Sequence, residues 1–141
     1  MFDLARPYCF GIFEKATGNM VGMVGLHNYD ERRRMAQCEW YIFKPYRGNG
    51  YGKEAFTALA EHAFQGKLAE LREGDWFYSY KKHYAKIDLL RAEIRRRNLP
   101  SHALAKACGF VHRYTDPRHY VVEGEGCEDG EIYELTPEDL A

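Results

Sequence analysis

The alternation of apolar and polar residues predicts strands in the first third of the chain. Residues 8–30 contain two runs rich in β-branched and aromatic side chains on either side of a turn at residues 16–19, a pattern typical of a β-hairpin. Residues 35–43, "MAQCEWYIF", predict a third strand. This strand should end before Pro45, because proline cannot donate a hydrogen bond to a sheet.

After residue 50 the apolar residues recur with the spacing of a helix. Phe56, Leu59 and Ala63 recur at helical spacing, so an amphipathic helix is predicted from Lys53 to about residue 65. Gly66 is predicted to end it.

The second half of the chain predicts another strand and another helix. Residues 86–94, "KIDLLRAEI", predict a strand, although their spacing also allows a helix. Asn98 suits an N-cap, Pro100 fits a first helical turn and Gly109 suits a helix end, so a short helix is predicted over residues 99–108.

The remaining segments complete the predicted architecture. Residues 111–126 and 131–135 read as closing strands separated by a Gly/Asp-rich turn. Residues 66–85 are dense in aromatic side chains without a clean period, so they are interpreted as an insertion. Strands that flank two helices predict a mixed α/β sheet within one domain spanning residues 1–141.

Composition and charge narrow the class of protein. Twenty Lys plus Arg nearly balance twenty-one Asp plus Glu, so the bulk charge gives no support for nucleic-acid binding. The first residues lack a secretory signal pattern, and the apolar runs are much shorter than the roughly 20 residues of a membrane helix. The four cysteines are widely scattered without zinc-ligand spacing. These features predict a cytoplasmic protein with reduced cysteines, no membrane partner and no metal.

The stretch "YRGNGYGKEA", residues 46–55, carries the clearest candidate chemistry. A glycine-rich turn between a strand and a helix gathers backbone N–H groups and the positive helix end around one point, which favours a phosphate. The P-loop pattern fails, because Arg47 stands at its first glycine position and Glu54 follows Lys53. The dinucleotide pattern also fails, because it requires glycine at Lys53.

Arg47 to Gly52 instead has the form [QR]-x-x-G-x-G and resembles the coenzyme loop of the GNAT superfamily of acetyl-CoA-dependent N-acyltransferases. Three segments, "ATGNMVGMVGL", "CEWYIFKPYRGNGYGKEA" and "NLPSHALAKACGF", resemble successive parts of that family and cover about three quarters of the chain with their surroundings. The branch that acetylates N-terminal amines of ribosomal proteins is the most similar.

The resemblance implies a mostly antiparallel sheet that splays between the family's fourth and fifth strands, with residues 35–43 as the fourth. Family members usually begin with one strand and two helices, and the loop between these helices forms a wall of the acceptor site. This chain starts close to their second strand, so that wall is expected to be missing. The N-terminal elements therefore look shortened. The insertion at 66–85 could replace the missing acceptor wall or supply a homodimer contact.

Residue by residue, the resemblance assigns a coenzyme site. The loop would wrap the pyrophosphate, the pantetheine arm would pair along Ile42 and Phe43 as an extra strand, and Asn98 would hydrogen-bond that arm. The residues implied to bind acetyl-CoA are Ile42, Phe43, Arg47, Gly48, Asn49, Gly50, Tyr51, Gly52, Lys53 and Asn98.

Two residues are implied to be catalytic. Ser101 stands where this branch places a hydroxyl near the coenzyme sulfur, and Ala105 replaces the tyrosine acid that other branches use. Glu39 is the only carboxylate of its strand and is the candidate base, with Tyr41, His27 and Tyr29 in reserve. The competing interpretations are a helix-start residue for Ser101 and a solvated or salt-bridged strand residue for Glu39.

Three functions follow from these patterns. The leading prediction is an enzyme that moves an acetyl group from acetyl-CoA to a primary amine, either a protein N-terminus or a small molecule, by direct transfer in a ternary complex. The first alternative is a non-catalytic acyl-CoA-binding relative. The second is an RNA-binding module that uses the arginine triplets at 32–34 and 95–97, although such charge runs are usually solvated surface.

Overall fold

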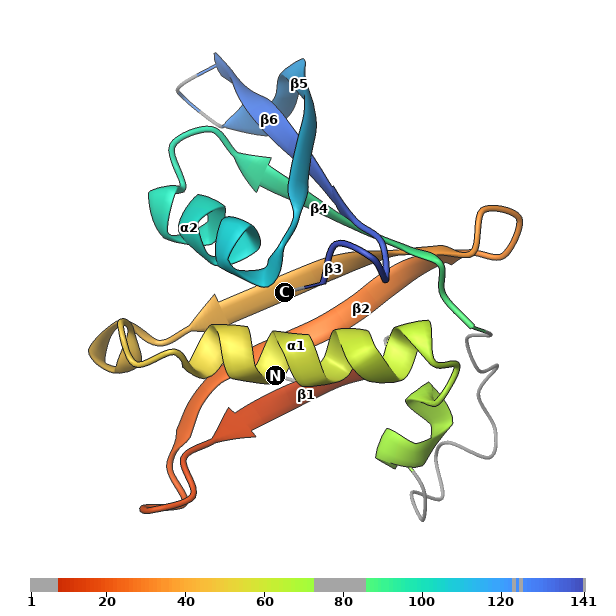
Figure 1. The fold of residues 1–141 in the computed structure, drawn as a ribbon. Helices are drawn as coiled ribbons and strands as arrows, with labels where there is room; N and C mark the ends of the chain where they lie inside the picture. The colour runs from red at the N-terminus through yellow and green to blue at the C-terminus, as the bar shows by residue number, and fades with distance from the viewer. Residues whose placement is uncertain (1–7, 73–85, 123, 125, 141) are drawn as a thin grey trace.

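The computed structural model describes residues 8–72, 86–122, 124 and 126–140. In chain order the elements are β1 (Tyr8–Phe13), β2 (Met20–Asp30), β3 (Met35–Ile42), η1 (Lys44–Tyr46), α1 (Tyr51–Phe64), η2 (Leu68–Arg72), β4 (Leu89–Arg95), α2 (Leu99–Cys108), β5 (Val111–Val122) and β6 (Gly126–Leu135). Figure 1 shows how the two α-helices lie against the strands. The predicted mixed α/β fold is confirmed.

The strands form one six-stranded sheet in the order β1-β2-β3-β4-β6-β5. All neighbouring pairs are antiparallel except β3 and β4. These two parallel strands pair at only three positions, from Met35 with Leu89 to Gln37 with Arg91. Beyond Gln37 they diverge, and α2 lies beside the opening (Figure 1). The expected splay is therefore present, between strands that are the third and fourth of the described chain.

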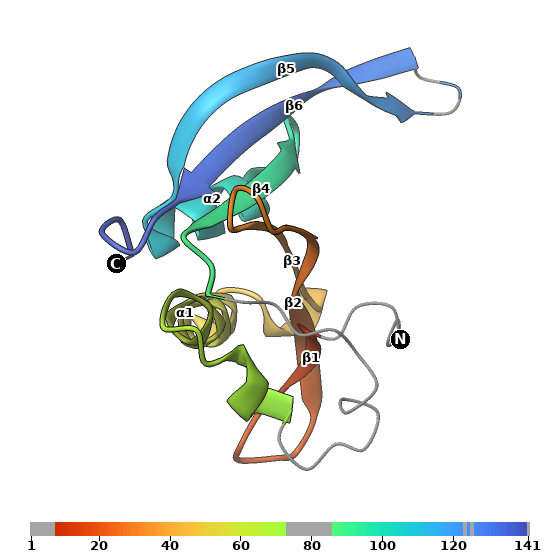
Figure 2. The ribbon, with the colours of Figure 1, turned by 90° about the vertical axis from the view of Figure 1, so that its right-hand side faces the viewer.

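The core lies between α1 and the sheet (Figure 2). Phe56 of α1 is fully buried and packs edge-on against Trp40, with ring centroids 5.3 Å apart. Burial of one such side chain contributes about 1.5–3 kcal/mol to stability. Phe110 contacts both rings and connects the packing of α1 to the chain that leaves α2.

The predicted helix boundaries are close to the observed ones. Helix α1 begins at Tyr51 rather than Lys53, because Gly50 adopts a left-handed conformation and serves as its N-cap. Helix α2 has the predicted limits: the side chain of Asn98 accepts a hydrogen bond from the amide of Ser101, and Gly109 closes the helix with a φ of +100°. Residues 89–95, for which both strand and helix were considered, form the strand β4.

The last hairpin differs from the prediction. Residues 127–130 were expected to form a turn, but β6 already begins at Gly126. The antiparallel ladder with β5 explains the difference, because it pairs Val122 with Gly126 and Tyr120 with Glu128. In the segment interpreted as an insertion, residues 68–72 form the short helix η2, and residues 73–85 lie outside the described residues.

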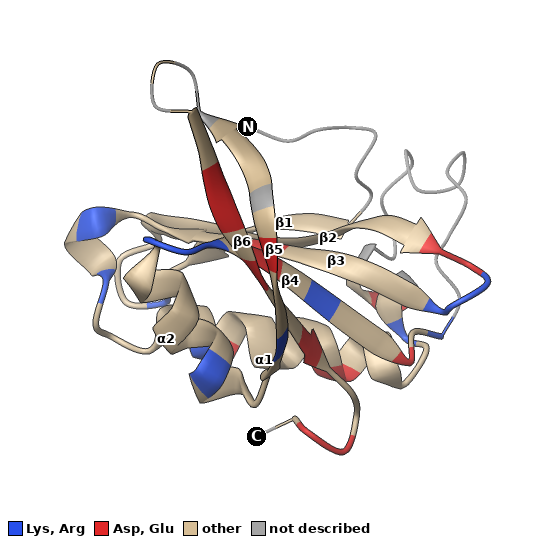
Figure 3. Cartoon of the chain, turned by 90° about the horizontal axis from the view of Figure 1, so that it is seen from above, with Lys and Arg blue, Asp and Glu red and all other residues tan. Residues whose placement is uncertain are grey.

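The basic turn at 32–34 and the glycine loop lie at opposite ends of β3, as Figure 3 shows. Nε of Arg33 lies 3.7 Å from Oδ2 of Asp30, and Nη1 of Arg34 lies 3.7 Å from Oδ2 of Asp88. This arginine triplet therefore adds no charge to the glycine loop.

Candidate active site

The three glycines of the loop serve two different purposes. Gly48 and Gly50 have φ values of +82° and +78°, and a Cβ atom built on either would meet no atom within 4 Å. Their backbone conformation favours glycine, and the space above them is open. Gly52 instead permits close packing, because a Cβ atom there would lie 3.1 Å from Leu104 and 3.3 Å from Ile42.

Side chains hold this loop in place. Asn49 donates from Nδ2 to the carbonyl of Tyr46 at 3.0 Å, and Arg47 donates from Nε to the carbonyl of Ile42 at 2.9 Å. Tyr51 donates its hydroxyl hydrogen to Glu14 in the β1–β2 hairpin. The loop is therefore shaped before any ligand arrives, which lowers the entropic cost of binding.

The loop opens the first turn of α1 towards solvent. The first hydrogen bond of the helix joins the amide of Glu54 to the carbonyl of Gly50, so the amides of residues 51–53 point out of the helix end. Together with the positive end of the helix dipole and the Arg47 guanidinium, these amides form a suitable site for a phosphate group.

A cavity of about 420 Å³ extends from this loop along α2. Nine of the ten residues predicted to bind the coenzyme line it, and Phe43 is the exception. The sequence reasoning missed the opposite wall, which consists of small and apolar side chains on α2. These are Pro100, Ala103, Leu104 and Ala107. Their spacing of three, four and seven residues is the signal that could have identified them.

The free edge of β3 borders the same cavity. The amide of Phe43 donates to the carbonyl of Val21 at 2.9 Å, and its carbonyl accepts from the amide of Tyr46. Main-chain groups alternate in direction along a strand, so Trp40 and Ile42 turn theirs towards the edge that β4 leaves open. Both main-chain groups of Phe43 are thus already bonded within the protein, and the carbonyl of Ile42 accepts from Arg47.

A second cavity, of about 360 Å³, lies between the diverging strands β3 and β4. It shares three lining residues with the first cavity, namely Trp40, Asn98 and Ser101. The two cavities therefore meet at the start of α2, and Ser101 faces both.

Ser101 occupies this junction with a defined hydrogen-bond arrangement. The indole Nε1 of Trp40 donates to its Oγ at 3.1 Å, and its own amide donates to Asn98 Oδ1 at 3.3 Å. A hydroxyl that accepts one hydrogen bond still carries a hydrogen to donate. Ser101 is therefore placed to act as a proton donor between the cavities.

Glu39, the predicted base, lines the second cavity. Its Oε2 lies 3.7 Å from Nδ1 of His27, and its side chain is 32% exposed. The structure thus places Glu39 and Ser101 around one cavity. Tyr41, a reserve candidate, lines the first cavity instead.

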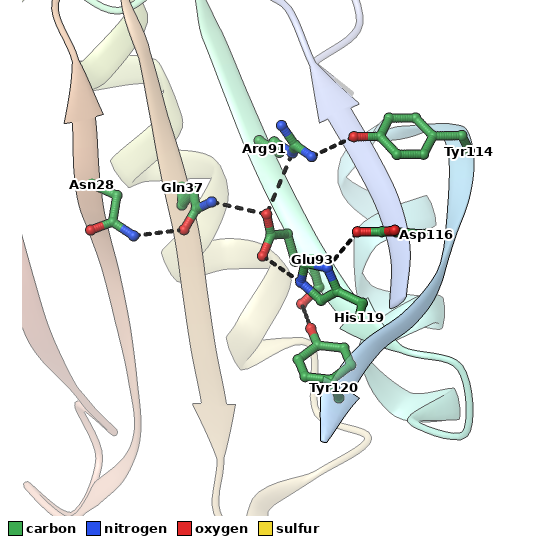
Figure 4. A network of polar contacts seen from close by, with 8 residues as sticks. All are labelled: Asn28, Gln37, Arg91, Glu93, Tyr114, Asp116, His119 and Tyr120. Atoms are coloured by element: carbon green, nitrogen blue, oxygen red, sulfur yellow. Dashed lines mark hydrogen bonds and ion pairs between the residues drawn. The ribbon is translucent and has the colours of Figure 1, made fainter. Parts of the chain in front are cut away.

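The sequence reasoning missed another carboxylate in the second cavity, that of Glu93 on β4. Figure 4 shows the network around it. Glu93 Oε1 accepts from Nε2 of Gln37 at 3.0 Å, and Oε2 lies 2.9 Å from Nε2 of His119. Nδ1 of His119 lies 2.7 Å from Asp116, and Tyr120 donates to the main-chain carbonyl of Glu93.

This network raises the pKa of His119. The hydrogen bond to Asp116 raises the pKa of His119, burial opposes the rise, and the hydrogen bond to Glu93 adds to it. Strand alternation along β4 puts Glu93 on the same face as Arg91 and Arg95. No local signal connects it to His119, which is 26 residues away.

Comparison with known proteins agrees with this geometry. A family model described as an acetyltransferase (GNAT) domain matches residues 1–111. The chain belongs to the GNAT acetyltransferase family. None of the curated proteins matches it significantly by sequence.

Solved GNAT structures share its fold. A proposed ribosomal-protein-serine acetyltransferase from Vibrio cholerae is 30% identical with a TM-score of 0.69, and the alignment covers 92% of this chain and 64% of that one. A ribosomal-protein-S5-alanine acetyltransferase from Vibrio fischeri is 17% identical with a TM-score of 0.72, covering 94% and 63%. A spermidine N-acetyltransferase variant from Vibrio cholerae is 15% identical with a TM-score of 0.68, covering 91% and 64%. The chain thus spans under two thirds of the length of these three structures.

Among the described residues, no helix is both long enough and apolar enough to cross a membrane. Within the same part of this GNAT chain, no three His, Cys, Asp or Glu side chains are arranged to hold a metal ion.

Proposed function

We propose that this GNAT domain transfers the acetyl group of acetyl-CoA to a primary amine by direct transfer in a ternary complex. The observation that carries the proposal is the meeting of two cavities at Ser101. One cavity has the features of a coenzyme site, and the other offers carboxylates to an amine. The transferred group would lie at the junction.

The coenzyme would occupy the larger cavity in two parts. Its pyrophosphate would lie against the amides of residues 50–53 and the guanidinium of Arg47, where positive potential gathers. Its pantetheine arm would run between the open edge of β3 and the apolar face of α2, and would pair with the main chain of Trp40 and Ile42. This route leads to Ser101 and Asn98.

Ser101 would assist the departure of the thiolate. The attacking nitrogen forms a bond to the acetyl carbon as the carbon–sulfur bond breaks, and the sulfur leaves with the electron pair. A hydroxyl already polarised by the Trp40 indole can donate its hydrogen to that sulfur, and the second proton lost by the attacking nitrogen would restore the hydroxyl. Direct transfer requires no covalent intermediate on the protein.

The acceptor amine would bind in the smaller cavity. Glu39 and Glu93 give this cavity two carboxylates, which attract an ammonium group and can accept its proton. Proteins with the same fold are described as acetylating ribosomal proteins or spermidine. On this basis we propose a protein N-terminal amine or a small-molecule amine as the acceptor.

A screen for thiol release tests the proposal. The protein is mixed with acetyl-CoA and a panel of amines that includes spermidine and peptides with free serine or alanine N-termini. We expect amine-dependent release of CoA thiol that Ser101→Ala reduces. Coenzyme binding without thiol release from any amine would favour the alternative of a non-catalytic acyl-CoA-binding relative.

A further inference from the structure

Strand β5 contains a bulge that changes the direction of one side chain. Asp116 pairs with Gly130 and Tyr120 pairs with Glu128, so four steps along β5 correspond to two steps along β6. Pro117 lies inside this irregularity, where its missing N–H costs no ladder bond. Bulges often redirect side chains beside active sites, and here His119 points across β6 to β4 (Figure 4).

A glycine on the neighbouring strand makes room for this histidine. A Cβ atom built on Gly130 would lie 2.8 Å from both Cβ and Cγ of His119 and 2.9 Å from its Cδ2. Contacts this short do not occur between real atoms, so any other residue at position 130 would displace the ring. The His119 ring therefore packs directly on the bare backbone of β6.

The ring connects the acceptor cavity to a more exposed carboxylate. Of the described residues in this network, Glu93 and Tyr120 line the cavity, whereas His119 and Asp116 do not. The side chain of His119 is 23% exposed and that of Asp116 is 45% exposed. The side chains of Glu93, His119 and Asp116 thus form a hydrogen-bonded path from the cavity towards solvent.

We propose that His119 is a positioning residue that receives the amine's proton through Glu93, with Asp116 holding the protonated imidazole. The inference rests on the proposed function, because the proton concerned is that of the attacking amine. It identifies Glu93 as the first proton acceptor and gives Glu39 the task of binding the ammonium group.

The proton balance of this path is simple. The ammonium group gives one proton to a carboxylate oxygen of Glu93, and the electron pair of the broken N–H bond stays on nitrogen for the attack. The O–H proton of Glu93 then moves to Nε2 of a neutral His119 whose Nδ1–H is donated to Asp116. The products are a carboxylate and an imidazolium, which releases one proton to water before the next cycle.

The charged surroundings of His119 set the pH at which this path operates. Two carboxylates contact the ring directly, and Nε of Arg91 lies 3.6 Å from Glu93 Oε1. The titratable or charged groups that face the ring or its partners are Asp116 and Tyr120 on β5, Glu93, Arg91 and Arg95 on β4, and Glu128 on β6. The carboxylates favour the imidazolium, so the pKa of His119 lies above its ordinary value.

The sign of the pH effect follows from this shift. Only neutral His119 can receive a proton, so activity should fall as the pH drops through the raised pKa. Asp116→Asn removes the carboxylate that contributes most to the rise, and the acidic limb of kcat/KM should move to lower pH. His119→Gln keeps a donor towards Glu93 but cannot take a proton, so kcat should fall on the order of 10- to 100-fold with CoA affinity unchanged.

The test compares pH profiles of kcat/KM for the wild type, Asp116→Asn and His119→Gln with one amine. His112→Gln is the matched control, because His112 lies on the same strand, bonds Glu131 instead, and should leave the profile unchanged. Gly130→Ala displaces the ring without removing it and should reproduce part of the loss. Profiles of both His119→Gln and Asp116→Asn that overlay the wild type would overturn the proposal.

A second measurement separates this proposal from the proposed function. NMR titration of the His119 ring should give a pKa above the ordinary histidine value that falls in Asp116→Asn and in Glu93→Gln. An ordinary pKa that neither substitution changes would refute the relay even in an active enzyme. A raised, coupled pKa in a protein that releases no thiol would instead refute the proposed function.

Discussion

The two cavities of this GNAT domain are built in opposite ways. The proposed coenzyme cavity takes eight consecutive residues, 46–53, from one loop and helix start, together with one face of α2 and the end of β3. The proposed acceptor cavity takes side chains from β2, β3, β4, α2 and β5. The first depends on local backbone conformation, whereas the second depends on how distant strands are placed relative to one another. Substitutions should therefore affect the two cavities separately.

The largest effect is expected from a substitution that removes CoA binding alone. Gly50→Asp forces a side chain onto a backbone with a φ of +78° and adds negative charge at the proposed pyrophosphate position. We expect millimolar CoA to raise the melting temperature of the wild type by several degrees and to leave that of Gly50→Asp unchanged.

Gly124→Asp is the matched control for this substitution. Gly124 has a φ of +79° with no atom within 4 Å of a built Cβ, but it lies in the distant β5–β6 turn. Its variant should retain the response to CoA. A normal response in Gly50→Asp would show that the glycine loop does not hold the coenzyme.

The sequence predicts a region well where local backbone conformation builds it, and poorly where distant strands must come together. Gly48, Gly50 and Asn98 act through their own backbone or the adjacent turn, so a short stretch of sequence was enough to predict the glycine turn and the helix cap that they form. The partners of Glu93 could not be identified in this way, because its contact with His119 depends on a strand order of β4-β6-β5 and a two-residue bulge. Pro117 was visible in the sequence, but a proline alone does not specify the register shift around it.

The second prediction sharpens the acceptor side by comparing its two carboxylates. Glu93→Gln removes the first proton acceptor, so we expect kcat/KM for the amine to fall on the order of 100-fold. Glu39→Gln should mainly raise the KM of the amine and keep the acidic limb of the pH profile. Both variants should bind CoA normally. A lost acidic limb in Glu39→Gln with a retained limb in Glu93→Gln would reverse the two assignments.

The third prediction concerns the junction, where the cavities share residues. Ser101→Ala keeps the amide that Asn98 caps but removes the hydroxyl, so kcat should fall on the order of 10- to 100-fold with nearly unchanged CoA affinity. Ser101→Thr retains a hydroxyl and should recover part of the rate. Full turnover by Ser101→Ala, measured by thiol release, would reduce Ser101 to a helix-start residue.

The smallest expected effect separates stability from binding at Asn98. Asn98→Ala removes the acceptor for the Ser101 amide and should destabilise the fold by about 1 kcal/mol. Asn98→Asp keeps an acceptor oxygen and should restore most of that stability, as measured by denaturant unfolding. If the coenzyme arm needs the side-chain amide, both variants should bind CoA more weakly. Wild-type affinity in Asn98→Asp would limit Asn98 to a capping role.

Two-substrate initial-rate kinetics test the central claim most directly, because two cavities that meet at Ser101 should hold both substrates at once. Thiol release is measured while acetyl-CoA and an active amine from the screen are varied independently. We predict double-reciprocal lines that intersect, together with an acetylated amine and an unmodified protein by mass spectrometry. Parallel lines with an acetylated protein, or thiol release independent of every amine tested, would contradict direct transfer between the two cavities.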